Sequence, residues 1–99
     1  MLYTEQTPNP ETLKFVTNRM LYRGTADFRE ETLAREWSPL ASELFDLPFV
    51  KGIYISNNFV TVTKEFNYSW DDIKLNIKDF IKKYVESSKA ILNLSLIHI

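Results

Sequence analysis

Cysteine is absent from the 99 residues of this chain, and histidine occurs once, as His98. The chain by itself therefore has no thiolate nucleophile, no disulfide framework and no thiolate ligands for a metal. A serine hydrolase needs a histidine base beside its nucleophile, and a zinc site usually takes several ligands from cysteine and histidine. A single histidine next to the C-terminus disfavours both kinds of site.

Glycine is also scarce, and the chain has no large excess of positive or negative charge. With Gly24 and Gly52 as the only glycines, neither a P-loop nor a dinucleotide-binding fingerprint can be built. The 12 basic and 13 acidic residues nearly cancel, and no Lys/Arg cluster supplies the positive field that a nucleic-acid backbone requires. No apolar run reaches the roughly 18 residues of a membrane span, and the first residues lack a signal-peptide pattern. We therefore expect no nucleic-acid partner, no membrane partner and a cytoplasmic location.

The composition that is present is typical of a soluble globular domain. Apolar residues make up 44% and charged residues 25% of the chain, which indicates neither disorder nor a fibrous protein. This length can bury one hydrophobic core but not two. We expect residues 1–88 to form a single domain. Residues 89–99 are a mostly apolar tail that either packs, drives association, or is a truncated or non-native end.

The first half of the chain contains two weaker strand patterns and one clear helix pattern. Residues 13–17 are β-prone and follow the extended segment 7–10, and residues 21–28 form a second run. Alternation in that second run places one set of side chains on one face: Tyr22, Gly24, Ala26 and Phe28. Residues 38–47 predict a helix, with Ser38 as N-cap, and residues 30–37 are left open as a turn or loop. The apolar stripe of this helix is Leu40, Leu44 and Leu47.

A hairpin is the clearest local prediction. Residues 50–56 and 59–64 are β-rich and are separated by Asn57 and Asn58, which are favoured in tight turns. This loop pairs Ser56 with Phe59, Ile55 with Val60, Tyr54 with Thr61, and Ile53 with Val62. One face of the hairpin is then wholly apolar and needs a cover: Ile53, Ile55, Val60 and Val62.

A long amphipathic helix supplies that cover. Ser69 is its predicted N-cap, and Asp71 and Asp72 suit the positive end of the helix dipole. The apolar stripe comprises Trp70, Ile73, Ile77, Phe80, Ile81, Tyr84 and Val85. Together the patterns predict an α+β, two-layer sandwich. It would have a mainly antiparallel four-stranded sheet, the order ββαββα, and two helices on one face.

Three segments form an ordered set of motifs. Residues 7–15 read T-P-N-P-x-x-L-K-F, residues 38–45 read S-P-L-A-x-x-L-F, and residues 58–64 read N-F-V-T-V-T-K. A tryptophan, Trp70, then opens the last helix. This ordered set resembles the N-terminal domain of the Nfu/NifU-type iron–sulfur cluster scaffold proteins, over about residues 6–85.

The resemblance implies a non-catalytic accessory domain that recognises partners in iron–sulfur cluster assembly or delivery. It implies no cofactor in this chain, because the cluster is expected only on a separate domain or protein with a Cys-x-x-Cys pair. The implied partners are a cluster scaffold or carrier domain and recipient apoproteins. Residues within or beside the motifs are our candidates for partner binding: Asn9, Lys14, Tyr54, Asn58, Phe59, Thr61, Thr63 and Lys64.

Two alternatives remain at this point. The same fold could serve as a generic protein-interaction module outside iron–sulfur metabolism. The acidic pairs Glu30-Glu31 and Asp71-Asp72 could instead perform acid–base chemistry or bind a hard cation. Adjacent acidic residues are usually a solvated surface or a helix start, and this last alternative lacks the supporting histidine, cysteine and glycine residues.

Overall fold

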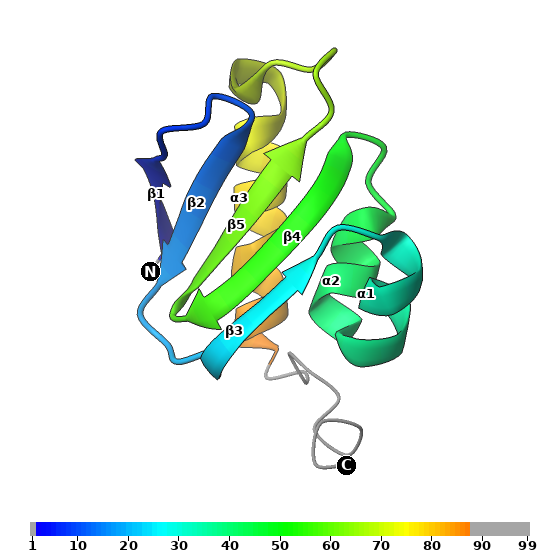
Figure 1. Ribbon diagram of the computed structural model, residues 1–99. Helices are drawn as coiled ribbons and strands as arrows, with labels where there is room; N and C mark the ends of the chain where they lie inside the picture. The colour runs from blue at the N-terminus through cyan, green and yellow to red at the C-terminus, as the bar shows by residue number, and fades with distance from the viewer. Residues whose placement is uncertain (1, 88–99) are drawn as a thin grey trace.

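The computed structural model describes residues 2–87 (Figure 1). The predicted tail, residues 89–99, lies outside the described residues. The elements in chain order are β1 (Leu2–Gln6), β2 (Thr12–Thr17), β3 (Tyr22–Phe28), α1 (Glu31–Trp37), α2 (Pro39–Phe45), β4 (Val50–Asn57), β5 (Phe59–Lys64) and α3 (Trp70–Glu86).

The strands form one five-stranded antiparallel sheet in the order β1-β2-β5-β4-β3. In Figure 1, α3 crosses behind the sheet and the α1–α2 pair lies beside β3, whereas the face turned to the viewer carries no helix. The predicted α+β class is confirmed. The predicted four-stranded ββαββα order is wrong, because the described residues contain a fifth strand, β1, and a third helix, α1.

Both missed elements have weak local patterns. Of the five β1 residues only Leu2 is buried, so the strand shows little apolar alternation, and its pairing with β2 holds it in the sheet. In α1 the one buried residue is Ala34. The side chain of Glu30, its N-cap, makes no capping hydrogen bond. Such elements depend on tertiary contacts more than on their own periodicity.

The β4–β5 hairpin has the predicted register. Ser56 lies opposite Phe59, and Tyr54 lies opposite Thr61. Asn57 has a φ of 51°, a left-handed conformation that asparagine tolerates better than most residues. The four apolar side chains predicted to need a cover are at most 2% exposed and lie in the core: Ile53, Ile55, Val60 and Val62.

The helices begin where their caps predict. The Ser38 hydroxyl accepts a hydrogen bond from the Ala41 N–H at 3.0 Å, and the Ser69 hydroxyl accepts one from the Asp71 N–H at 3.3 Å. The first of these helices, α2, ends at Phe45, two residues before the predicted end. Along α3, the residues buried against the sheet are Ile73, Ile77, Ile81 and Tyr84.

The predicted face of residues 21–28 is interrupted at Gly24. Phe28 is buried and Tyr22 packs partly against the core, but Gly24 is exposed with a φ of 151°. The register with β4 shifts between Tyr22 and Thr25. This irregularity breaks the simple two-residue alternation of an ideal strand.

Candidate partner-binding surface

The sheet face without helices, here called the open face, is formed mainly by β2, β5 and β4. Side chains alternate along β5, so Phe59, Thr61 and Thr63 are partly exposed there while Val60 and Val62 are buried beneath the helices. Lys14 of β2 and Tyr54 of β4 lie on either side of Thr61 in the register. Five of the eight predicted candidates therefore share this face: Lys14, Tyr54, Phe59, Thr61 and Thr63.

Two of these residues form an aromatic pair. The rings of Tyr54 and Phe59 stack with centroids 6.1 Å apart and an interplanar angle of 21°. The Lys14 ammonium lies 4.2 Å from the Phe59 ring centroid, within cation–π range, and 3.4 Å from a carboxylate oxygen of Glu5. These contacts hold the aromatic pair in place on the surface.

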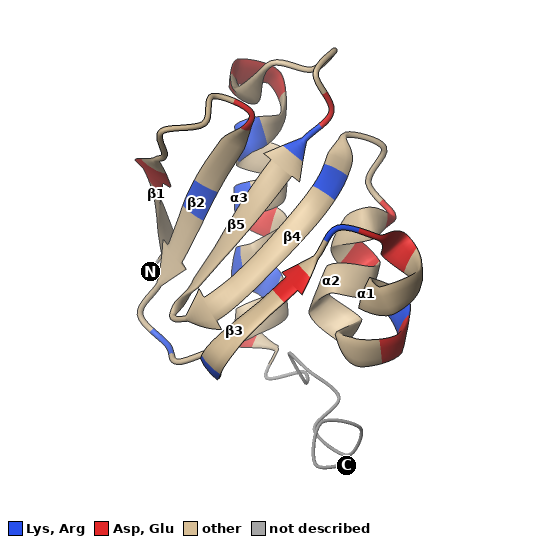
Figure 2. Ribbon diagram, viewed as in Figure 1, with Lys and Arg blue, Asp and Glu red and all other residues tan. Residues whose placement is uncertain are grey.

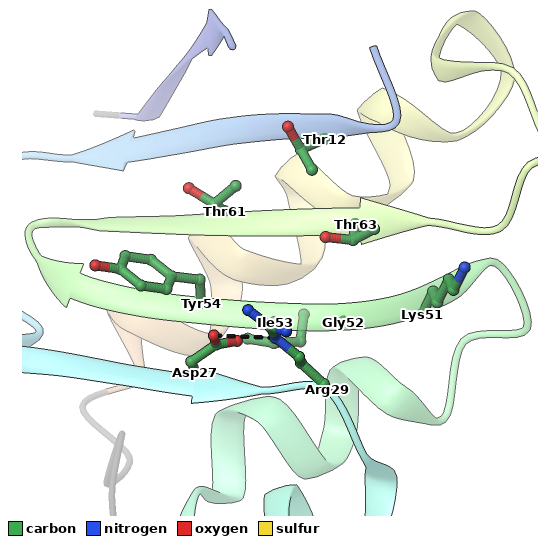
Figure 3. A pocket seen from close by; sticks show the side chains of 9 residues that line it. All are labelled: Thr12, Asp27, Arg29, Lys51, Gly52, Ile53, Tyr54, Thr61 and Thr63. Atoms are coloured by element: carbon green, nitrogen blue, oxygen red, sulfur yellow. Dashed lines mark hydrogen bonds and ion pairs between the residues drawn. The ribbon is translucent and has the colours of Figure 1, made fainter. Parts of the chain in front are cut away.

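A hollow of about 430 Å³ adjoins the aromatic pair (Figure 3). We call it the Gly52 hollow, because Gly52 contributes no side chain where β4 passes it. A Cβ at position 52 would lie 3.5 Å from the Thr63 side chain, an ordinary contact distance, so a small side chain would fit there without a clash. The hollow is lined by Thr12, Asp27, Arg29, Lys51, Gly52, Ile53, Tyr54, Thr61 and Thr63.

The rim of the hollow carries more positive than negative charge. Asp27 and Arg29 form an ion pair at 3.3 Å, drawn as a dashed line in Figure 3. Lys51 is exposed and has no ion pair within residues 2–87. In Figure 2 the central strands of this face are mostly uncharged, with isolated basic positions on β2 and β4. The arrangement suits contact with another molecule better than proton transfer.

Comparison with known proteins identifies the family. The family model described as "Scaffold protein Nfu/NifU N terminal" matches residues 2–88. The chain belongs to the Nfu/NifU N-terminal family. The resemblance seen in the sequence motifs is thereby confirmed.

Relatives and solved structures agree with this assignment. The Drosophila sechellia protein named "NFU1 iron-sulfur cluster scaffold homolog, mitochondrial" is 37% identical over 94 residues, covering 93% of this chain and 33% of that protein. The Homo sapiens protein of the same name is 39% identical over 85 residues, covering 80% of this chain and 33% of that protein. The Nfu/NifU N-terminal domain described here thus spans about a third of the length of these relatives.

Two solved structures share the fold. The solution structure of a NifU-like protein from Saccharomyces cerevisiae superposes with a TM-score of 0.80 and 27% identity, covering 94% of this chain and 84% of that one. Protein SAV1430 from Staphylococcus aureus superposes with a TM-score of 0.67 at 16% identity, covering 80% of this chain and 94% of that one. The second match concerns the fold alone.

The other three candidates lie away from the open face of the Nfu/NifU N-terminal domain. Asn9 lies in the β1–β2 loop, where its side-chain oxygen accepts the Glu11 N–H at 2.9 Å. The Asn58 side chain donates to the Thr17 carbonyl at 3.0 Å. Lys64 is 8% exposed and shares the helix-covered face with Val62. In the structure these residues make internal contacts, and their role in partner binding stays a prediction.

Sequence reasoning missed five polar or small residues of this surface: Thr12, Asp27, Arg29, Lys51 and Gly52. Gly52 carried a usable signal, because a glycine inside a strand often marks a close approach by another group. Thr12, Asp27 and Arg29 gave none, since Thr12 reaches the hollow only through the pairing of β2 with β5, and Asp27 and Arg29 only through that of β3 with β4. These pairings join segments far apart in the chain.

The titratable groups with shifted pKa values lie outside the open face. Burial, with a smaller contribution from the Glu43 charge, raises the pKa of Tyr84 on α3 to about 12. Hydrogen bonds that Arg35 on α1 donates to the carboxylates of Asp46 and Glu31 raise the pKa of its guanidinium above the usual value. Residues 2–87 contain no group of three or more His, Cys, Asp or Glu side chains that could hold a metal ion. No helix in the same range is long and apolar enough to cross a membrane.

Proposed function

We propose that this domain is a non-catalytic accessory domain of iron–sulfur cluster assembly or delivery that recognises a protein partner through its open face. The observation that carries the proposal is the open face itself, where a partly exposed aromatic pair and an adjoining hollow lie side by side. Exposed aromatic residues with polar surroundings are typical of protein-binding surfaces. The pathway is inferred from the relatives, whose names describe iron–sulfur cluster scaffold homologues.

In this proposal the cluster is cargo carried by another domain or protein. Iron–sulfur clusters are held by cysteine thiolates in most proteins, and this chain has no cysteine. The residues present do not fit a cluster site, so a separate Cys-x-x-Cys partner is expected to ligate it. The candidate partners are such a scaffold or carrier domain, or a recipient apoprotein. No reaction is assigned to the domain itself.

The cytoplasmic location stays a prediction, since the relatives are named as mitochondrial proteins. Fractionation of cells that express the natural gene with an epitope tag distinguishes the two compartments.

An affinity experiment tests the proposed function. The full chain is immobilised, native-like lysate is passed over it, the captured proteins are identified and the iron bound to the bait is measured. A parallel bait carries Thr61→Arg, which places a long charged side chain in the middle of the open face. A control bait carries Asn76→Arg, an exposed position on α3.

We expect the natural chain and the Asn76→Arg control to capture cluster-assembly proteins or iron–sulfur apoproteins without iron on the bait. We expect Thr61→Arg to lose them. Stoichiometric iron on the natural chain would contradict the non-ligating role. Capture of unrelated proteins alone would instead support a generic interaction module outside iron–sulfur metabolism.

A further inference from the structure

We propose that the Gly52 hollow receives the carboxylate of an acidic side chain from a partner protein, while an adjacent apolar side chain of that partner packs on the Tyr54–Phe59 pair. This inference rests on the proposed function, because it names the chemistry of the partner that the open face recognises. Unfilled space, unused hydrogen-bond donors and an excess of positive charge carry it.

The space fits a protruding side chain. At about 430 Å³ the hollow is within the size range of ligand sites, and it lies on the surface of a sheet, as Figure 3 shows. Its floor is open because Gly52 has no side chain, although a Cβ there would meet Thr63 atoms only at an ordinary contact distance of 3.5 Å. A residue with a small side chain at position 52 would therefore cause no steric clash.

Unused donors surround the space. The hydroxyls of Tyr54, Thr61 and Thr63 make no hydrogen bond within residues 2–87, and Figure 3 shows these side chains on the same face of the sheet. The Thr12 hydroxyl differs, since it donates to the Asn9 carbonyl at 3.0 Å within the β1–β2 loop. A carboxylate oxygen can accept hydrogen bonds from several such hydroxyls at once.

Charge selects an acidic group over a basic one. The Asp27 carboxylate is already paired with Arg29 at 3.3 Å, and the Lys51 ammonium has no ion-pair partner in the described part of the chain. A carboxylate in the hollow would give Lys51 that partner, whereas a basic side chain would be repelled by the Lys51 ammonium. Rim charges of this kind contribute mainly specificity and association rate.

The aromatic pair supplies the apolar part of the contact. Tyr54 belongs both to the pair and to the lining of the hollow, so a segment seated in the hollow passes directly beside Phe59. A symmetric contact between two copies of the chain is disfavoured, because it would place the same positive rim on both sides. The occupant is therefore a different protein that presents an acidic residue next to an apolar one.

Nuclear magnetic resonance with the isotope-labelled full chain tests the inference. The probes are three capped peptides, acetyl-Leu-Glu-Leu-amide and its counterparts with Gln or Lys at the centre. We expect the Glu peptide to shift the amide signals of Lys51, Gly52, Thr61 and Thr63, and to bind about threefold to tenfold more tightly than the Gln peptide. Equal binding of the Glu and Gln peptides, a preference for Lys, or shifts confined to another face would overturn the proposal.

Matched variants test separately the contribution of the Lys51 charge and that of the space above Gly52. Lys51→Gln is expected to remove the preference for Glu over Gln, while Lys82→Gln, at an exposed position on α3, leaves it unchanged. Gly52→Val is expected to occupy the floor of the hollow beside Thr63 and to weaken the peptide-induced shifts. Loss of the Glu preference in both lysine variants would indicate general charge attraction instead of this site. Signals that depend on protein concentration without peptide would indicate self-association on this face.

The two proposals fail in different ways. If Thr61→Arg abolishes the capture of cluster-assembly proteins but Lys51→Gln has no effect and the peptides show no preference, the acidic anchor is wrong and the proposed function stands. If the Glu peptide binds the hollow but no cluster-assembly protein is captured, the chemistry of the hollow stands and the proposed function is wrong.

Discussion

Replacement of Gly52 by alanine should stabilise the domain, although Gly52 lies inside β4 beside the core. The backbone at Gly52 is outside the left-handed region, and the new Cβ would lie 3.5 Å from the Cβ and hydroxyl of Thr63 and 3.6 Å from the Phe28 carbonyl oxygen. These are ordinary van der Waals distances. Because glycine in a strand costs roughly 0.5 to 1 kcal/mol relative to alanine, the substitution should raise the free energy of unfolding by about that amount.

For a domain of this size, such a gain corresponds to an increase in Tm of about 2 to 8 °C. Thermal and urea unfolding followed by circular dichroism measure it. The chain contains a matched control, because Gly24 has a φ of 151° and a Cβ there would lie 3.2 Å from the Tyr22 ring. Gly24→Ala should therefore destabilise the domain by about 1 to 3 kcal/mol.

A destabilising effect of Gly52→Ala would refute this reasoning. It would mean that the backbone at Gly52 needs glycine for its own packing, and the hollow would then be a by-product of the fold. Stabilisation together with weaker peptide binding would instead show that the chain forgoes available stability at this position. A trade of this kind is common where a surface is used for binding.

Three further substitutions test the core, a helix cap and a buried phenol. Ile77→Ala removes a fully buried side chain from α3 and should cost about 2 to 5 kcal/mol in urea unfolding, whereas the exposed Asn76→Ala should change it by less than about 0.5 kcal/mol. Ser38→Ala removes the acceptor for the Ala41 N–H and should cost about 0.5 to 2 kcal/mol in the same assay; no change would show that the cap is replaceable. Tyr84 should be among the last tyrosines to ionise, near a pH of about 12, in an absorbance titration, and Tyr84→Phe should remove that step. Because its folded pKa is raised above the usual 10.0, its contribution to stability is complete below pH 10 and is lost as the pH rises toward 12.

Local patterns predicted the elements whose signals lie within a few residues. The register of the β4–β5 hairpin follows from two asparagines between alternating apolar residues, and Ser69 with a helical apolar stripe predicted the start of α3. The same alternation places Lys64 on the side of Val60 and Val62, so its burial could have been inferred from the sequence. The motif resemblance depended on residue identities alone, and the family match confirmed it.

The candidate site residues also differ in whether a local pattern or a distant strand pairing places them. The sequence already placed Tyr54 opposite Thr61, because the hairpin is local. The side-by-side position of Lys14 and Thr61 was not accessible, since β2 and β5 pair across more than half of the domain. Asn9 and Asn58 were selected as polar residues in motifs, but their side chains bond to the backbone of nearby loops and strands.

Residue identities and contacts close along the chain were enough to predict the family, the α+β class, the hairpin and the faces of its strands. The fifth strand, the helix α1 and the order β1-β2-β5-β4-β3 follow instead from how the whole chain packs. That order brings Thr12 of β2, Asp27 of β3 and Arg29 just after β3 beside the β4–β5 hairpin that contains Gly52. Pairing between distant strands is set by burial of the whole core, and no local pattern encodes it.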